Sequence, residues 1–173
     1  MKGESEFLSE LCLPLPRMQV FDFFADAFNL EALTPPFLHF VVLTPRPIEM
    51  RAGTLIDYKL RVHGLPLHWR TRISAWEPPC RFVDEQLRGP YRQWIHEHRF
   101  EERDGGTLMF DRVRYVVPGG WFIHKLFVRR DVEKIFAFRR ERLSERFGNV
   151  QVCGPLSRRA GATNLMPLPV SEP

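Results

Sequence analysis

Two histidines and an aspartate are the strongest candidates for chemistry in this sequence. His96 and His98 are two positions apart in a segment rich in aromatic and β-branched residues, so in a strand both side chains would point to the same face. Asp111 lies in the following segment, on the face that it would share with Met109 and Tyr115. An imidazole titrates near neutral pH, and a neighbouring carboxylate orients the ring. The three residues indicate either general acid–base catalysis or an aspartate that satisfies a buried histidine.

The same histidines raise the question of a metal site. The sequence His96-x-His98 followed by Glu102 resembles the ligand spacing of cupin metal sites, and imidazole is a ligand for several transition metals. However, Gly89 lies one position away from that pattern, and the later part of the chain matches the second cupin motif poorly. A cupin barrel also leaves no place for a long terminal helix. We therefore predict no metal and no cofactor.

Nothing in the sequence assembles a nucleophile. Ser74 is the only serine between Ser9 and Ser144, and no Gly-x-Ser-x-Gly turn occurs, which argues against a hydrolase triad. Cys80 follows two prolines and has no histidine near it in sequence, so a buried or incidental thiol is favoured. The three cysteines are far apart and fit neither a disulfide framework nor a CxxC zinc site.

Short runs of β-branched and aromatic residues, bounded by Gly or Pro, predict the sheet that must position these side chains. The seven expected strands cover residues 7–13, 38–44, 53–62, 67–76, 81–88, 93–102 and 107–117. Two short helices are expected after the first strand, one beginning near Pro16 and one from Asn29 to Leu33. Between Gly120 and Gly148 there is no Gly or Pro, and apolar residues recur at helical spacing, which predicts one long terminal helix.

This order of elements is typical of an α+β fold, because the helices are segregated from the run of strands. A curved antiparallel sheet needs cover on one face, and the terminal helix is the only expected element that is long and apolar enough. We predict one domain over residues 1–148 and a Pro-rich, disordered tail over residues 149–173. Incomplete closure of sheet and helix would leave a cavity between them.

Several stretches carry a resemblance to a known family. They are GTLIDY at 53–58, WRTRI at 69–73 with WEPP at 76–79, FVDEQ at 82–86 with GPY at 89–91, WIHEHRF at 94–100, and GGT at 105–107 with DRVRY at 111–115. In this order and spacing they resemble the bacterial ligand-binding branch of the START-like, or SRPBCC, superfamily. The resemblance covers roughly residues 4–148. It implies a helix-grip fold, with a curved seven-stranded antiparallel sheet wrapped on the terminal helix, and a cavity for a hydrophobic small molecule.

Strand alternation then assigns the side chains that would line this cavity. Phe82, Asp84 and Gln86 are assigned to the inward face of their strand, although Val83 and Leu87 on the opposite face are apolar too. The resemblance places Phe37, Trp121 and Phe122 near the mouth. The candidate ligand-binding residues are Tyr58, Trp69, Thr71, Gln86, Trp94, His96, His98, Asp111, Tyr115, Trp121 and Phe122.

Composition limits the possible functions. The chain has 173 residues, of which 44% are hydrophobic and 15 are Phe, as expected for one globular domain with a thick core or an apolar pocket. The formal net charge of +4 is modest and the charged residues alternate in sign, which does not favour nucleic-acid binding. The acidic N-terminus and the lack of an apolar run of 18 residues favour a cytoplasmic protein without a membrane span.

Three functions remain open from the sequence. The first is binding of a lipid, quinone, polyketide or aromatic molecule in the cavity. The second is a polyketide cyclase or dehydratase, in which His96 or His98 moves protons with Asp111. The third is a lipid or quinone carrier that contacts a membrane transiently. The oligomeric state is not indicated by the sequence.

Overall fold

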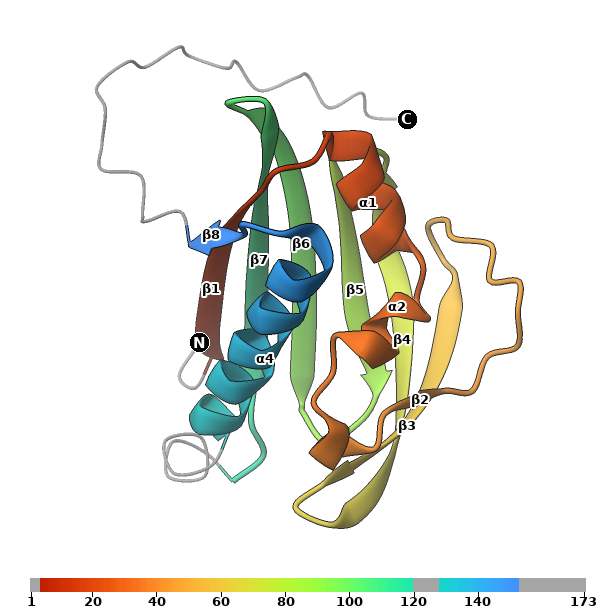
Figure 1. The fold of residues 1–173 in the computed structure, drawn as a ribbon. Helices are drawn as coiled ribbons and strands as arrows, with labels where there is room; N and C mark the ends of the chain where they lie inside the picture. The colour runs from red at the N-terminus through yellow and green to blue at the C-terminus, as the bar shows by residue number, and fades with distance from the viewer. Residues whose placement is uncertain (1–3, 120–127, 153–173) are drawn as a thin grey trace.

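The computed structural model describes residues 4–119 and 128–152. Its main element is a curved antiparallel sheet of eight strands in the order β2-β3-β4-β5-β6-β7-β1-β8, with the helices packed on one face (Figure 1). The strands are β1 (Glu4–Leu13), β2 (Val41–Val42), β3 (Leu55–Val62), β4 (Leu65–Glu77), β5 (Arg81–Arg88), β6 (Gln93–Arg103), β7 (Gly106–Val116) and β8 (Gln151–Val152). The predicted α+β helix-grip architecture is confirmed.

The helices divide the sheet face between them. They are α1 (Arg17–Ala25), α2 (Asn29–Ala32), the 3-10 turn η1 (Pro36–Leu38) and α4 (Arg129–Phe147). In Figure 1, α4 crosses in front of β1, β7 and β6, whereas α1 and α2 lie in front of the β5 side of the sheet. Contacts join α1 to β6 and β7, and α4 to β1.

Two elements differ from the sequence-based expectation. The strand expected over 38–44 is reduced to Val41–Val42, because Pro35 and Pro36 start the η1 turn and His39 ends it in a left-handed conformation (φ 44°). An eighth strand, Gln151–Val152, pairs with Leu11 and Cys12 of β1. The start of the predicted terminal helix, before residue 128, lies outside the described residues.

The core follows the two-residue alternation of the strands. On β6 and β7 the buried positions include Phe100, Met109 and Val113, each at most 1% exposed. Phe21 of α1 packs edge-on against Phe100, with ring centroids 5.6 Å apart, and Leu143 of α4 is fully buried in the same cluster. This cluster closes one part of the space between helices and sheet.

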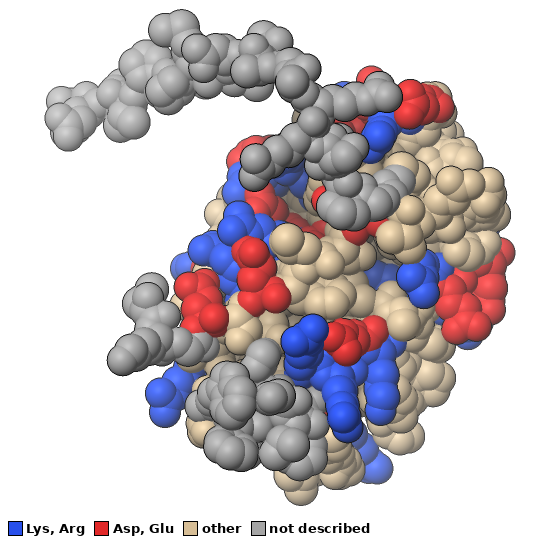
Figure 2. All heavy atoms as spheres, turned by 90° about the vertical axis from the view of Figure 1, so that its left-hand side faces the viewer, with Lys and Arg blue, Asp and Glu red and all other residues tan. Residues whose placement is uncertain are grey.

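The outer face of the sheet is charged. Glu6 of β1 pairs with Arg112 of β7 at 2.6 Å, and Glu4 lies 3.9 Å from Arg114. These cross-strand pairs accompany the extension of β1 to Glu4, three residues before the predicted start. Figure 2 shows side chains of both signs interspersed over one side of the molecule.

The described cysteines differ in their bonding. Cys12 on β1 is disulfide-bonded and Cys80 is free and exposed, which corrects the interpretation that the cysteines form no disulfide. That bond was missed because the pairing of cysteines far apart in sequence depends on the tertiary fold.

Within residues 4–119 and 128–152, none of the helices has both the length and the hydropathy needed to cross a membrane.

Candidate functional site

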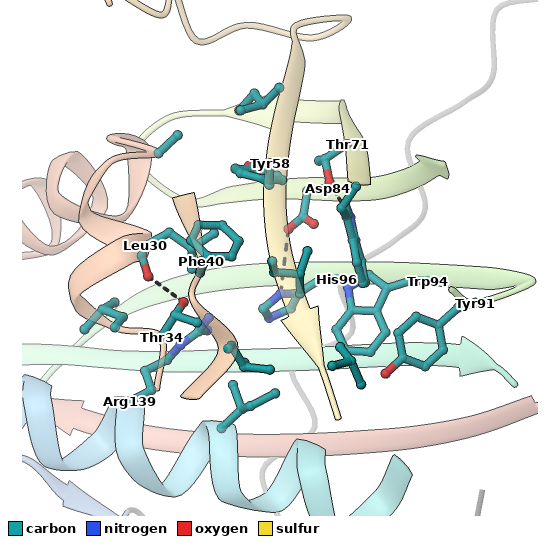
Figure 3. A pocket seen from close by; sticks show the side chains of 18 of the residues that line it. Leu30, Thr34, Phe40, Tyr58, Thr71, Asp84, Tyr91, Trp94, His96 and Arg139 are labelled. Carbon is teal, nitrogen blue, oxygen red and sulfur yellow. Dashed lines mark hydrogen bonds and ion pairs between the residues drawn. The ribbon is translucent and has the colours of Figure 1, made fainter. Parts of the chain in front are cut away.

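A cavity of about 750 Å³ lies between the helices and the concave face of the sheet. Residues from α1, α2, β3, β4, β5, β6 and α4 all contribute to its lining. Figure 3 shows aromatic side chains along the sheet side and Arg139 of α4 reaching in from the opposite side. This volume lies in the range of known small-molecule sites.

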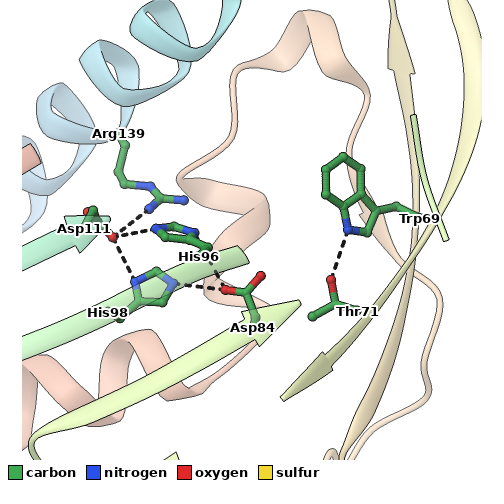
Figure 4. A network of polar contacts seen from close by, with 7 residues as sticks. All are labelled: Trp69, Thr71, Asp84, His96, His98, Asp111 and Arg139. Carbon is green, nitrogen blue, oxygen red and sulfur yellow. Dashed lines mark hydrogen bonds and ion pairs between the residues drawn. The ribbon is translucent and has the colours of Figure 1, made fainter. Parts of the chain in front are cut away.

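The sheet side of the cavity is an aromatic wall. Trp69 and Trp94 meet edge to face with ring centroids 5.5 Å apart, and Tyr91 lies 4.8 Å from Trp94. The indole Nε1 of Trp69 donates a hydrogen bond to Thr71 Oγ1 at 3.0 Å (Figure 4). Because that N–H is already satisfied, the ring presents an apolar surface to the cavity. Burial raises the pKa of Tyr58 and Tyr91, so both phenols stay neutral.

The turn between β5 and β6 places Tyr91 in this wall. Gln86 Nε2 donates to the backbone carbonyl oxygen of Tyr91 at 2.7 Å. A Cβ atom at Gly89 would collide with the Gln86 side chain, so a larger residue here would displace Gln86 from its hydrogen bond to Tyr91. Gln86 was predicted to bind ligand, but the structure places it behind the turn and not in the cavity lining.

A charged cluster lies deeper in the cavity and comes from three neighbouring strands and one helix. The β5–β6 register pairs Asp84 with His96, and the β6–β7 register pairs His98 with Asp111. All four side chains therefore share the concave face, where α4 adds Arg139 (Figure 4). Asp111 is 2% exposed, and His96 and His98 are each 6% exposed.

Each histidine ring lies between the two carboxylates. His96 Nε2 is 2.9 Å from Asp111 Oδ1, and His98 Nδ1 reaches the same oxygen at 2.9 Å, at an angle outside hydrogen-bond geometry. On the other side, Asp84 Oδ2 is 3.3 Å from His98 Nε2 and 3.7 Å from His96 Nδ1. Arg139 Nη1 forms an ion pair with Asp111 Oδ1 at 3.6 Å.

These contacts give the histidines different charges. Burial lowers the pKa of His96, and the neighbouring His98 lowers it further, so that His96 is neutral. Burial also opposes the charge on His98, but its contacts with Asp111 and Asp84 outweigh burial and raise its pKa. Burial would raise the pKa of Asp111, yet its contacts with His96, His98 and Arg139 hold it far below the usual range. Asp111 is thus a permanently ionised anchor.

The structure distributes the predicted site residues among three places. Cavity-lining positions are taken by Tyr58, Trp69, Thr71, Trp94, His96, His98 and the expected mouth residue Phe37. Asp111, Tyr115 and Gln86 do not line the cavity. Asp111 acts through the histidines, and Tyr115 packs 5.7 Å behind Trp94. Trp121 and Phe122 lie outside the described residues.

Two residues of the cluster were missed in the sequence. Asp84 was assigned to the inward face with Phe82 and Gln86, and it does line the cavity, but it was not selected as a site residue. Arg139 was not singled out, although Val132, Phe136, Arg139 and Leu143 follow a spacing of four, three and four residues. That spacing defines the buried stripe of α4. An arginine within such a stripe was the signal that could have identified it.

Asp84, His96 and His98 are also a group that can hold a metal ion. Each offers one ligand atom, and these atoms lie within 4.8 Å of one another. Glu102, the third ligand suggested by the sequence spacing, pairs instead with Arg17 at 3.2 Å and is not part of this group.

Solved structures with the same fold include proteins of diverse origin. The Zhui aromatase/cyclase from Streptomyces sp. R1128 is 15% identical, with a TM-score of 0.65 over 83% of this chain and 93% of that chain. Ginseng major latex-like protein 151 from Panax ginseng is 7% identical, with a TM-score of 0.62 over 83% and 97%. Protein TTHA0849 from Thermus thermophilus is 20% identical, with a TM-score of 0.58 over 82% and 99%. At these identities, the likeness concerns the fold.

No curated protein matches the chain. A protein family does: residues 13–144 match the family described as polyketide cyclase/dehydrase and lipid transport. This match extends from the end of β1 to the last turn of α4 and so includes the cavity and the charged cluster. With its helix-grip fold, the chain belongs to the polyketide cyclase/dehydrase and lipid transport family of the SRPBCC, or START-like, superfamily.

Proposed function

We propose that the protein binds a hydrophobic small molecule, of lipid, quinone, polyketide or aromatic type, inside the cavity. The observation that carries this proposal is the cavity of about 750 Å³ with its aromatic wall. A ligand that buries roughly 300 Å² of apolar surface gains about 7 kcal/mol before the entropy costs of binding. Desolvation of the ligand therefore supplies the main driving force.

Arg139 indicates that the ligand also has a polar end. This residue is 5% exposed and lines the cavity, and its Nε and Nη1 atoms have no hydrogen-bond acceptor within the described part of the chain. Among the described residues, its Nη1 has the 3.6 Å ion pair with Asp111 as its one charged contact. Buried donors without an acceptor cost free energy. An oxygen on the ligand, in a carboxylate or carbonyl group, would satisfy them while the apolar body contacts the aromatic wall.

A cyclase or dehydratase activity in the same cavity is the second candidate. It is favoured by one observation: His96 and His98 both line the cavity and both contact a buried carboxylate. A bound molecule would therefore lie next to groups able to exchange protons. Replacing His98 with Gln should abolish turnover and leave ligand binding in place if this activity exists, whereas a binding protein shows no turnover to lose.

The binding proposal is tested by identifying and displacing the ligand. Native mass spectrometry of protein from its own host, followed by denaturing extraction, should reveal a retained apolar molecule. Displacement of an apolar fluorescent probe then measures affinity for the wild type and for Leu30→Phe, which fills part of the cavity at α2. The matched control is Leu8→Phe, since Leu8 is 61% exposed on β1. Equal affinity of all three proteins for the probe would refute binding inside the cavity.

A further inference from the structure

Three potential metal ligands converge at one point of the cavity. Asp84 contributes Oδ2 from β5, while His96 and His98 contribute one ring nitrogen each from alternate positions of β6. The carboxylate oxygen lies 3.3 Å from His98 Nε2 and 3.7 Å from His96 Nδ1. The arrangement is a product of strand register, because the β5–β6 pairing sets Asp84 opposite His96.

One nitrogen of each histidine ring contacts Asp111, which leaves the other nitrogen of each ring to face Asp84. His96 Nε2 is 2.9 Å from Asp111 Oδ1, as is His98 Nδ1. Because a carboxylate only accepts hydrogen bonds, His96 Nε2 donates to Asp111 Oδ1, while His98 Nδ1 lies against the same oxygen. The other nitrogen of each ring, His96 Nδ1 and His98 Nε2, faces Asp84 Oδ2. A metal ion that binds at this point replaces any proton on these nitrogens.

A proton can bridge only one of these contacts, whereas a metal ion can bind all three atoms at once. Zinc–ligand bonds near 2.0–2.1 Å place tetrahedral ligands about 3.4 Å apart, close to the separations measured from Asp84 Oδ2. Two imidazole nitrogens and one carboxylate oxygen are a donor set for transition metals and not for calcium or magnesium. Metal-binding histidines commonly donate their other N–H to a carboxylate, which is the position of Asp111.

We propose that Asp84, His96 and His98 bind one divalent transition-metal ion, with the tetrahedral geometry of zinc and an open fourth position. Asp111 holds both rings from behind and is a positioning residue, not a ligand. All three ligands line the cavity, so the open position faces the bound molecule. The charge of the ion offsets those of Asp84 and Asp111, and Arg139 adds one further positive charge. The fourth position therefore suits a water molecule or an anionic oxygen.

The test uses the full chain without an affinity tag, stripped of metal with a chelator. Isothermal titration with zinc chloride should give one ion per chain, and cobalt(II) should give the intense visible absorption of a four-coordinate site. Asp84→Asn and His98→Gln should each lose most of the zinc affinity. Asp111→Asn should weaken it by about 10- to 100-fold, the usual effect of removing a residue that orients a metal ligand.

Two control variants address alternative zinc sites. His68→Gln removes a histidine near Asp57 on the outer face, and Glu102→Gln removes the residue suggested by the cupin-like spacing. Both should bind zinc like the wild type, with circular dichroism confirming that every variant is folded. Failure of the wild type to bind zinc or cobalt would overturn the proposal. Unchanged zinc affinity in Asp84→Asn and His98→Gln would overturn it as well. Neither result bears on ligand binding by the cavity.

Discussion

Replacing Asp111 with Asn should destabilise the protein strongly, because this carboxylate is the buried counter-charge of the cluster. Its Oδ1 atom faces His96, His98 and Arg139, and the side chain is 1% exposed. Asn keeps the shape but removes the negative charge, so the guanidinium of Arg139 and the protonated ring of His98 lose their partner. Breaking a buried ion pair in this way costs about 3–5 kcal/mol.

This loss of free energy is large compared with the total stability of a domain. Natural domains unfold with free energies of roughly 5–15 kcal/mol, so the substitution should remove a substantial fraction. In a domain of this size each kcal/mol lowers the melting temperature by roughly 2–4 °C, which gives a decrease of roughly 6–20 °C. Equilibrium unfolding in urea, followed by tryptophan fluorescence with a chelator present, measures the change in free energy without any metal contribution.

Asp57→Asn is the matched control. Asp57 accepts two hydrogen bonds from Arg70, at 2.8 and 3.0 Å, and these bonds lower its pKa. Its pairing is better aligned than that of Asp111 with Arg139, but it lies on the exposed face, where water screens the charges. The control should therefore change the urea midpoint only slightly. If Asp111→Asn shifts the midpoint no more than Asp57→Asn does, burial is not what makes the cluster important.

Three further substitutions test the cavity and its support. Leu143→Ala, at a fully buried position on α4, should lower the free energy of unfolding by about 2–5 kcal/mol, measured in urea. Gly89→Ala should displace the Gln86 side chain, move Tyr91 out of the aromatic wall and reduce the affinity for an apolar probe in a fluorescence titration. Arg139→Met should weaken binding of a fatty acid by about tenfold, because a charge-assisted hydrogen bond to the carboxylate is lost. In competition assays, binding of the methyl ester of the same fatty acid should be less affected.

Each of these expectations has a contradicting outcome. Leu87→Ala removes an exposed leucine on β5, and a loss equal to that of Leu143→Ala would contradict the assigned core. Unchanged probe affinity in Gly89→Ala would mean that the turn does not position the wall. Equal losses for the acid and the ester in Arg139→Met would show that Arg139 does not bind the polar end of a ligand.

The sequence predicted those parts of the site that depend on a single strand. In a strand, successive side chains point to opposite faces, so the shared orientation of His96 and His98 needs no knowledge of neighbouring strands. The same reasoning separated Asp111 from Arg112. The Gly and Pro breaks between strands, and the helical spacing after Gly120, similarly indicated the order of elements because these signals are local.

Partners on different elements were decided by the tertiary structure alone. Asp84 joins the histidines because of the β5–β6 register, which alternation within its own strand could not reveal. Glu102 has suitable spacing from His98, but it lies near the end of β6, where Arg17 of α1 pairs with it. Local patterns carry no information about which residue another element brings into contact.

The sequence by itself determined the α+β class, the order of strands and helices, and the face of each histidine, since backbone geometry and residue preference act over a few neighbouring positions. The tertiary structure decided the size of the cavity, the placement of Asp84 and Arg139 around the two rings, and the pairing of β8 with β1. These features arise from the sheet register and from the path of α4 across the sheet, and both result from packing of the whole chain.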